Sequence, residues 1–246
     1  MKRFRSSLLF LGLAALAAAQ TPAGGRFESM KVHATEMPRF PAVLVARGVT
    51  NGLVQVVAKV DETGRLEDWL VVGYSQPLLA DLAVEALKEW QFTPARFDGQ
   101  PTTAQSQIEF NFRVDGVVIS QHMTEHFLAR VSGRSGPELV YRPCSLRDLD
   151  RIPTPVNVIS PYYDDKMVSE GLRGEVTVDF YIDEKGQVRM PVVSADQPPQ
   201  LAALALDAVR QWTFEPPTRR GEPVLVQARQ RFNFVPREVR ETMATN

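Results

Sequence analysis

Two consecutive stretches decide the fold of this chain: Gly174-Glu-Val-Thr-Val-Asp-Phe-Tyr-Ile182 and Asp183-Glu-Lys-Gly186. In the first, every second residue from Val176 onward is large and apolar and the residues between are mostly polar, which is the period of a half-buried β-strand. In the second, the final glycine accepts the positive φ of a tight turn. Together they predict a strand that reverses into a hairpin, with the return strand over residues 187–194.

After this hairpin the apolar residues change to helical spacing. One apolar face follows Pro198-Pro199 and is formed by Leu201, Leu204, Ala205, Ala208, Val209 and Trp212. Because Pro216-Pro217 cannot continue a helix, we expect the helix to end near Trp212. A turn at Arg220-Gly221 then leads to a third strand over residues 224–234, which ends in alternating phenylalanines. The predicted order is β-β-α-β, with one helix packed on a small antiparallel sheet.

The same pattern occurs a second time, displaced by 122 positions. Residues 52–112 align with residues 174–234 without a gap, and both copies carry Asp-x-x-Gly, Trp-x-Phe-x-Pro and Phe-Asn-Phe in the same order. In the first copy we therefore expect strands over 53–60, 65–73 and 103–114 and a helix over 78–90. Solenoid units are about 20–50 residues long, so a period this long indicates two complete domains. The sequence predicts an α+β fold of two tandem β-β-α-β two-layer domains.

The two copies define the boundaries that we expect along the rest of the chain. A signal peptide occupies residues 1–19 and a flexible N-terminus residues 20–36. The two domains cover residues 37–114 and 158–236, with a connector over 115–157 and a C-terminal tail over 237–246. Within the connector, Val118 to Val131 is a candidate helix, and the remainder is a connecting segment.

The first residues have the features of an export signal. Three basic residues precede a short apolar run over 8–18, and Ala17-Ala18-Ala19 offers the small residues at which signal peptidase cuts, before Gln20. The run is shorter than the ~20 apolar residues that a membrane-spanning helix needs. We therefore expect an exported, periplasmic protein. Anchoring in the inner membrane is the alternative if the leader is not cleaved.

Composition excludes several classes of function. The chain has 28 Lys plus Arg and 29 Asp plus Glu, for a net charge of −1. This balance gives no electrostatic reason to expect nucleic acid or an anionic membrane as the main partner. A single cysteine, Cys144, cannot form an internal disulfide. No P-loop, dinucleotide fingerprint or Gly-x-Ser-x-Gly motif is present, so we expect no cofactor.

The ordered recurrence of Gly-x-Val-x-Val, Asp-x-x-Gly, helix, Trp-x-Phe-x-Pro and Phe-x-Phe resembles the C-terminal domain of the TonB energy-transducer family. The first copy also carries Pro38-Arg-Phe-Pro41, similar to the family's Pro-x-Tyr-Pro, whereas Pro161-Tyr-Tyr-Asp164 in the second copy lacks the second proline. Together the two matches cover residues 38–112 and 160–234.

This resemblance implies a non-enzymatic two-layer domain. Such a domain binds the extended plug peptide of outer-membrane transporters, or related envelope partners, by adding it to a sheet edge. The family's transducers also carry an N-terminal membrane anchor and a long Pro-rich spacer, and this sequence departs from both features.

The last strand of each copy is the candidate binding edge on physical grounds as well. A three-stranded sheet leaves two edges with unpaired backbone groups, and a long edge strand is a template for β-augmentation. The outward polar residues of these strands are Gln107, Glu109, Asn111 and Arg113 in the first copy and Arg229, Arg231 and Asn233 in the second. We expect them to contact a peptide; alternatively, edge charges only prevent aggregation.

Two questions about these strands stay open at this stage. Gln230 occupies the inward position at which the first copy has Ile108. It predicts either a polar defect in the second core or a β-bulge that resets the register. A different class of function also fits: a structural envelope module in which the sheet edges pair with each other or with another copy.

The sharpest catalytic motif is His122-Met-Thr-Glu125-His126, which matches the inverted zinc-protease pattern. On a helix the two histidines would share one face and bind zinc, with Glu125 as general base. A zinc hydrolase is therefore a third hypothesis, although no downstream helix offers a third ligand. Cys144 with a histidine base is a similarly isolated candidate nucleophile.

Two other recurring residue types have structural interpretations. Asp61 and Asp183 are expected to bond the backbone of their own turns. Trp90 and Trp212, at the end of an apolar helical face, are expected to be core anchors.

Overall fold

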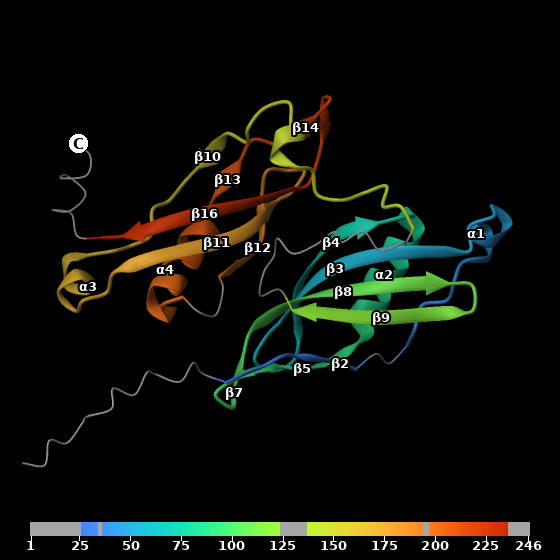
Figure 1. The fold of residues 1–246 in the computed structure, drawn as a ribbon, viewed down its shortest axis with the longest axis horizontal. Coiled ribbons are helices and arrows are strands. Elements are labelled where there is room, and N and C mark those ends of the chain that lie inside the picture. The colour runs from blue at the N-terminus through green and yellow to red at the C-terminus, as the bar shows by residue number, and fades with distance from the viewer. Residues whose placement is uncertain (1–25, 34–35, 124–136, 194–196, 236–246) are drawn as a thin grey trace, which may run out of the picture.

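The computed structural model describes residues 26–33, 36–123, 137–193 and 197–235. In this part of the chain two α+β units follow each other, each with one antiparallel main sheet and one long helix (Figure 1). This confirms the predicted fold class. We call residues 27–123 unit 1 and residues 155–235 unit 2.

Unit 1 has a four-stranded main sheet in the order β4-β3-β8-β9. Its strands are β3 (Asn51–Val60), β4 (Leu66–Tyr74), β8 (Ala104–Arg113) and β9 (Gly116–Met123). Helix α2 (Pro77–Glu89) covers one face through its buried residues. The remaining elements are α1 (Ala42–Ala46), β1 (Phe27–Glu28), β2 (Lys31–His33), β5 (Gln91–Thr93), β6 (Ala95–Phe97) and β7 (Gln100–Thr102).

Unit 2 has a three-stranded main sheet in the order β12-β11-β16. Its strands are β11 (Gly174–Ile182), β12 (Val188–Val193) and β16 (Val226–Phe234), and helix α4 (Pro199–Val209) packs on one face. The smaller elements are a 3-10 turn (Leu146–Asp148), β10 (Pro155–Asn157), α3 (Asp165–Ser169), β13 (Thr213–Phe214), β14 (Thr218–Arg219) and β15 (Glu222–Pro223).

The turn between the first two main strands is built in the same way in both units. One carboxylate oxygen of Asp61 accepts hydrogen bonds from the backbone N–H groups of Thr63 and Arg65. Asp183 does the same for Lys185 and Gln187. Bonds to Thr63 and Arg65 also hold the pKa of Asp61 below its ordinary value. The structural role predicted for these two aspartates is confirmed.

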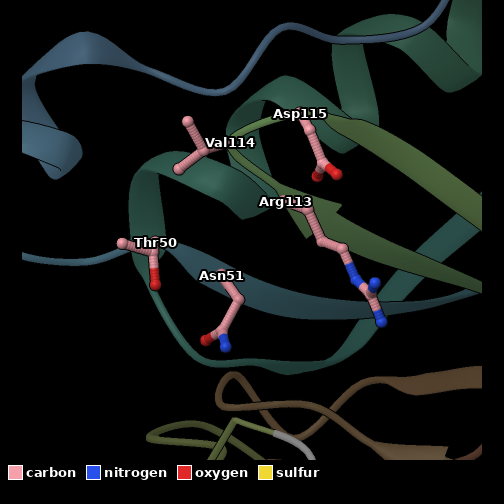
Figure 2. A pocket seen from close by; sticks show the side chains of 5 residues that line it. All are labelled: Thr50, Asn51, Arg113, Val114 and Asp115. Carbon is pink, nitrogen blue, oxygen red and sulfur yellow. The ribbon is translucent and has the colours of Figure 1, made fainter.

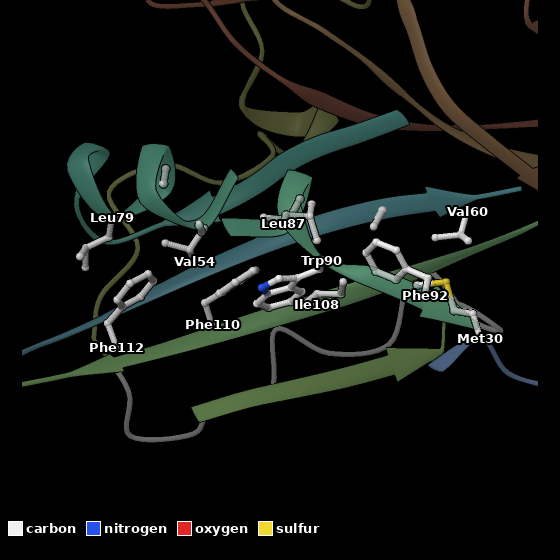
Figure 3. Packing of buried hydrophobic residues seen from close by; sticks show 14 of the residues in the cluster. Met30, Val54, Val60, Leu79, Leu87, Trp90, Phe92, Ile108, Phe110 and Phe112 are labelled. Carbon is white, nitrogen blue, oxygen red and sulfur yellow. The ribbon is translucent and has the colours of Figure 1, made fainter. Parts of the chain in front are cut away.

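Aromatic residues hold each core. Trp90 is 5% exposed and stacks on Phe110 at 5.0 Å between ring centroids. Figure 3 shows this pair beneath α2, with Phe112 further along β8. In unit 2 Trp212 is 7% exposed and meets Phe180 edge-on. Both tryptophans are therefore core anchors, as predicted.

Two expectations about the flanking segments are wrong. The connector does not begin with a helix, because residues 116–123 form β9 and pair with β8. The N-terminal segment is not loose over residues 27–33, since β1 pairs with β6 and β2 with β5. Met30, between these two strands, is 2% exposed, so burial and backbone pairing both fix this segment. The leader and the tail lie outside the described residues.

The two units also touch each other, through the sheet faces that point away from the helices. A small apolar cluster joins Val57, Leu70 and Val72 of unit 1 to Tyr181, Met190 and Leu225 of unit 2. At its margin Arg189 donates to the Asp68 carboxylate at 2.8 Å and to the carbonyl of Trp69. The units therefore have separate cores and share a face contact.

The tyrosine Tyr141, between the two units, adds to this contact. Its ring lies parallel to that of Tyr74, with centroids 4.9 Å apart, and its hydroxyl bonds to Glu184. In the ranges that the structure describes, no helix has the length and apolar character needed to cross a bilayer.

Candidate functional site

The last predicted strand of unit 1 is not a free edge. β8 pairs with β3 on one side and, from Arg113↔Gly116 to Ser106↔Met123, with β9 on the other. The candidate residues on it are Gln107, Glu109, Asn111 and Arg113, and all four lie in this interior strand. Their prediction as edge residues is wrong, because the two-residue turn Val114-Asp115 returns the chain along β8.

The last strand of unit 2 is an edge in the described part of the chain. β16 pairs with β11 in an uninterrupted register from Gly174↔Phe234 to Ile182↔Val226, and no other described strand pairs with it. The bulge predicted as one alternative at Gln230 is therefore wrong. The Gln230 side chain instead donates to the carbonyl oxygen of Arg231 at 2.7 Å.

A groove of about 730 Å³ runs beside the C-terminal half of this strand. Residues 230–235 line it on one side, and Val158, Ser160, Pro161 and Tyr163 line it on the other, together with Trp212. We call this the β16 groove and call residues 158–163 the strap. The indole N–H of Trp212 donates to the carbonyl of Ile159 at 2.8 Å and so fixes the strap beside the core.

Aromatic rings supply the apolar part of the β16 groove. Phe232 is only half-buried and its ring centroid lies 5.6 Å from that of Trp212. Its counterpart in unit 1, Phe110, is fully buried and packs in a core that β9 extends. Tyr163 of the strap meets Phe234 edge-on at 5.3 Å. The ring of Phe232 is thus more exposed than that of its counterpart Phe110, whereas Phe234 and Trp212 are buried.

The charged residues of β16 are paired across the sheet with β11. Arg229 donates to both carboxylate oxygens of Asp179, at 2.7 and 3.0 Å, and this contact raises the pKa of Arg229. Asp179 itself is 8% exposed. Arg231 contacts Glu175 at 3.1 Å, with both side chains largely in solvent. The first pair is partly buried and bidentate, whereas the second is a surface pair.

The direction of the backbone groups follows from one hydrogen bond. The N–H of Thr177 donates to the side chain of Gln197, which follows β12, at 2.7 Å. It therefore points away from β16. In a non-hydrogen-bonded pair of an antiparallel ladder, the N–H and C=O groups of the two facing residues point away from each other. Since Thr177 faces Arg231, the N–H and C=O of Arg231 are directed to the open edge, as are those of its alternate neighbours Arg229 and Asn233.

The predicted zinc motif does not have the geometry that it requires. His122 lies on the strand β9, whereas the predicted site requires both histidines on one helix. Glu125 and His126 lie outside the described residues. Within the described ranges no three histidine, cysteine or acidic side chains are close enough to hold a metal ion.

The candidate nucleophile Cys144 is buried beside unit 2. Its backbone N–H donates to Leu225 and its thiol is 3.5 Å from the carbonyl oxygen of Ser145. Burial raises the pKa of the thiol. Since the reactive form of cysteine is the thiolate, this environment disfavours nucleophilic chemistry.

A second hollow, of about 420 Å³, lies at the end of the unit 1 sheet and is lined by Thr50, Asn51, Arg113, Val114 and Asp115 (Figure 2). The polar lining of this hollow is not repeated in unit 2, because the residues 122 positions after Thr50 and Arg113 are Leu172 and Val235.

Sequence reasoning missed the residues opposite the strand. The strap and the open side of Trp212 were not expected to face β16. A signal was present in Pro161-Tyr-Tyr163, which corresponds to Pro38-Arg-Phe40 of unit 1. Phe40 and Tyr163 each pack against the core of their own unit.

Fold and site together define a class: tandem two-layer β-β-α-β domains, one of which presents an open strand edge beside an aromatic groove. The family model of the Gram-negative bacterial TonB protein C-terminal domain matches residues 36–114 and 159–236. The chain therefore belongs to the TonB C-terminal domain family, with two copies of the domain.

One relative illustrates the extent of the similarity. "Protein TonB" of Vibrio cholerae serotype O1 is 30% identical to the chain over 86 residues, which is 35% of this chain and 35% of that protein. The chain thus matches about a third of that relative's length.

Proposed function

We propose that this chain is an exported, non-enzymatic envelope protein that binds extended peptide segments by adding them to the β16 edge of unit 2. Its partners would be envelope proteins, including outer-membrane transporters that depend on TonB. One observation carries this proposal. Of the two homologous last strands, β8 is covered by β9, whereas no strand among the described residues pairs with the outer edge of β16, and a groove runs along it.

The backbone of β16 supports this mode of binding. The N–H and C=O groups of Arg229, Arg231 and Asn233 point to the outer side of β16, and strand addition takes its affinity from such groups. The carbonyl of Arg231 already accepts a hydrogen bond from the Gln230 side chain, which a bound strand would have to displace or share. Pockets for alternate side chains supply the selectivity. The rings of Trp212 and Phe232 offer such a pocket on the helix side of the edge.

A structural envelope module is the second candidate, and a specific contact favours it. β4 and β12 lie close to each other, and the Arg189 side chain of β12 donates to the backbone carbonyl of Trp69 on β4. The outer strands of the two main sheets are β4, β9, β12 and β16. β4 and β12 contact the other unit, and β9 belongs to the hairpin that covers β8. β16 is the strand on which the two candidates differ.

Two neighbouring proline substitutions test the proposal. Arg231→Pro removes an N–H that points to the open edge, so we expect the fold to remain intact and peptide binding to be lost. Phe232→Pro removes an N–H of the β11 ladder and a core side chain, so we expect unit 2 to unfold.

Thermal melts and titration with a plug peptide of an outer-membrane transporter measure both outcomes. A folded Arg231→Pro protein that binds the peptide as well as the wild type would favour the structural module. Export is tested separately: sequencing the N-terminus of the exported protein is expected to find Gln20.

A further inference from the structure

A stretch between the two units bonds to both of them through its backbone. Residues 139–145 pass from the side of unit 1 to the start of β16 (Figure 1). We call this stretch the clasp. At its unit 1 end, the N–H of Tyr74, the last residue of β4, donates to the carbonyl of Tyr141 at 3.1 Å. In return, the N–H of Val140 donates to the carbonyl of Tyr74 at 2.9 Å.

The other end of the clasp lies against unit 2. The N–H of Cys144 donates to the carbonyl of Leu225 at 2.7 Å, and Cys144 forms a parallel bridge with Val226, the first residue of β16. Because Val226 pairs with Ile182 of β11 on its inner side, this bridge lies on its outer side. The clasp therefore caps the first position on the outer side of β16.

Side chains fix the clasp where the two units meet. The ring of Tyr141 stacks on that of Tyr74, with centroids 4.9 Å apart, and its hydroxyl donates to the carboxylate of Glu184 in the hairpin turn of unit 2. One residue thus contacts β4 of unit 1 and the first hairpin of unit 2 together. At the other end Cys144 is 8% exposed, so this end is packed as well as hydrogen-bonded.

The face contact beside the clasp contains backbone strain. Met190 lies inside β12, yet its φ is +50°, a region that bulky residues rarely adopt. Its side chain is 2% exposed and belongs to the apolar cluster that includes Leu70 and Val72 of unit 1. Such strain persists only where the surrounding structure holds it. Packing against unit 1 supplies that support for Met190.

We infer that the clasp and the face contact make the two units one rigid body, in which the bond at Tyr74 and the cap at the start of β16 open and close together. Two residues separate Tyr141 from Cys144, so a displacement at either end is passed to the other. This inference goes beyond the proposed function, because it concerns how the units hold each other and requires no bound peptide.

Hydrogen exchange of two backbone amides, followed by NMR on the full chain, measures the state of both ends. Tyr74→Ala removes the stacked ring from unit 1, and we expect the Cys144 amide in unit 2 to exchange at least about tenfold faster. Cys144→Pro removes the N–H that bonds to Leu225, and we expect the Tyr74 amide to exchange faster by a similar factor, because coupling is reciprocal. If each variant loosened only its own end, the inference would be wrong.

The matched control lies within the clasp. The side chain of Val140 is 69% exposed, so Val140→Thr should leave exchange at both ends as in the wild type. An effect of this substitution as large as that of Tyr74→Ala would mean that exchange reports general loosening and not the clasp, and would overturn the inference.

Met190→Gly tests the face contact without touching the clasp. The substitution withdraws an apolar side chain from the contact, while glycine adopts the positive φ without strain. We expect the amides of β11 to stay protected and those of Tyr74 and Cys144 to exchange faster. Unchanged exchange at these two amides would show that the clasp does not depend on the contact, against the inference.

The rigid body itself is measured by nitrogen relaxation of the full chain. We expect unit 1 and unit 2 to have the same rotational correlation time. In the double variant of Tyr74→Ala with Met190→Gly we expect two shorter and unequal times. Unequal times in the wild type would mean that the units move separately, and the inference would fail whatever is found for peptide binding at β16.

Discussion

Unit 1 and unit 2 have the same register between their first and last main strands, yet they differ in what lies beyond the last one. Gly52 faces Phe112 in unit 1 just as Gly174 faces Phe234 in unit 2. The eight residues of β9 then cover the edge of β8, and β16 has no such cover among the described residues. The comparison teaches that one added strand covers the edge of the last strand without altering the register of the strands beneath it.

The largest expected loss of stability comes from removing the tryptophan of either core. Trp90→Ala and Trp212→Ala should each cost about 3–5 kcal/mol of unfolding free energy, the usual range for a large buried aromatic side chain. We expect Trp212→Ala to lie at the lower end, because water already reaches the β16 groove beside it. Hydrogen exchange followed by mass spectrometry reports each unit separately. Equal loss of protection in unit 1 upon Trp212→Ala would mean that the units unfold as one.

A substitution on β9 should convert unit 1 into a second open unit. Ile119→Asp places a charge against the core, so we expect a loss of about 1.5–3 kcal/mol and release of β9 from β8. The number of peptide sites, measured by calorimetry, should then rise from one to two.

The control for this variant lies one residue away. Val118→Asp falls on the opposite face, where Val118 is 57% exposed, and should leave β9 in place. If both variants or neither changed the stoichiometry, the cover over β8 would not be what distinguishes the units.

The contact between the units should weaken at alkaline pH. Burial raises the pKa of Tyr181, and burial together with Glu184 raises that of Tyr141. The neutral form of each is therefore favoured by folding. This stabilisation is complete below the unfolded pKa of about 10 and is lost above it, by about 1.4 kcal/mol per pH unit for one such group.

Chemical denaturation from pH 8 to 11 measures this loss, and Tyr181→Phe should flatten the slope. Tyr162→Phe is the comparison: Tyr162 is 69% exposed and its pKa is raised by a surface hydrogen bond to Asp164, so we expect this substitution to change the slope less than Tyr181→Phe does. A slope unaffected by Tyr181→Phe would show that this tyrosine stays neutral in both states.

The smallest expected effect concerns the surface pair of β16. Arg231→Gln and Glu175→Gln should each cost no more than about 1 kcal/mol, and less in high salt, because both side chains are largely exposed. Urea denaturation of the single and double variants measures their coupling. A double variant that loses the sum of both single effects would mean that the pair contributes nothing.

Much of the fold is predictable from the sequence because its signals are local. The alternation from Val176 to Ile182, the Asp-x-x-Gly turn and the helical face ending before Trp212 each specify one element, and the repeat confirms them in the other unit. β9 was not predictable in the same way. A short apolar run such as 117–119 fits a helix or a strand. The strand is favoured by a long-range contact, the packing of Val117 and Ile119 on the core that contains Phe110 and Phe112.

The site was predictable only in part. Alternation placed Arg229, Arg231 and Asn233 on the outward face. The place of a strand at the end of its repeat did not by itself predict an edge, because the same argument failed for β8, which β9 covers. The position of the strap was only partly signalled: Pro161-Tyr-Tyr163 corresponds to Pro38-Arg-Phe40, but residues 158–163 have no periodic pattern. Their position depends on the hydrogen bond from Trp212 to Ile159, a contact across 53 positions of sequence.

The β8–β9 hairpin also affects the order in which strands pair during synthesis. A chain that carries two similar units in tandem is prone to exchange strands between them while it folds. Hairpins form within about 1–10 μs. At a synthesis rate of about 5–20 residues per second, the 59 residues from Met123 to Ile182 take about 3–12 s to follow. By the time β11 emerges, β8 has a partner on both sides, and the strand that most resembles β16 is no longer available for mispairing.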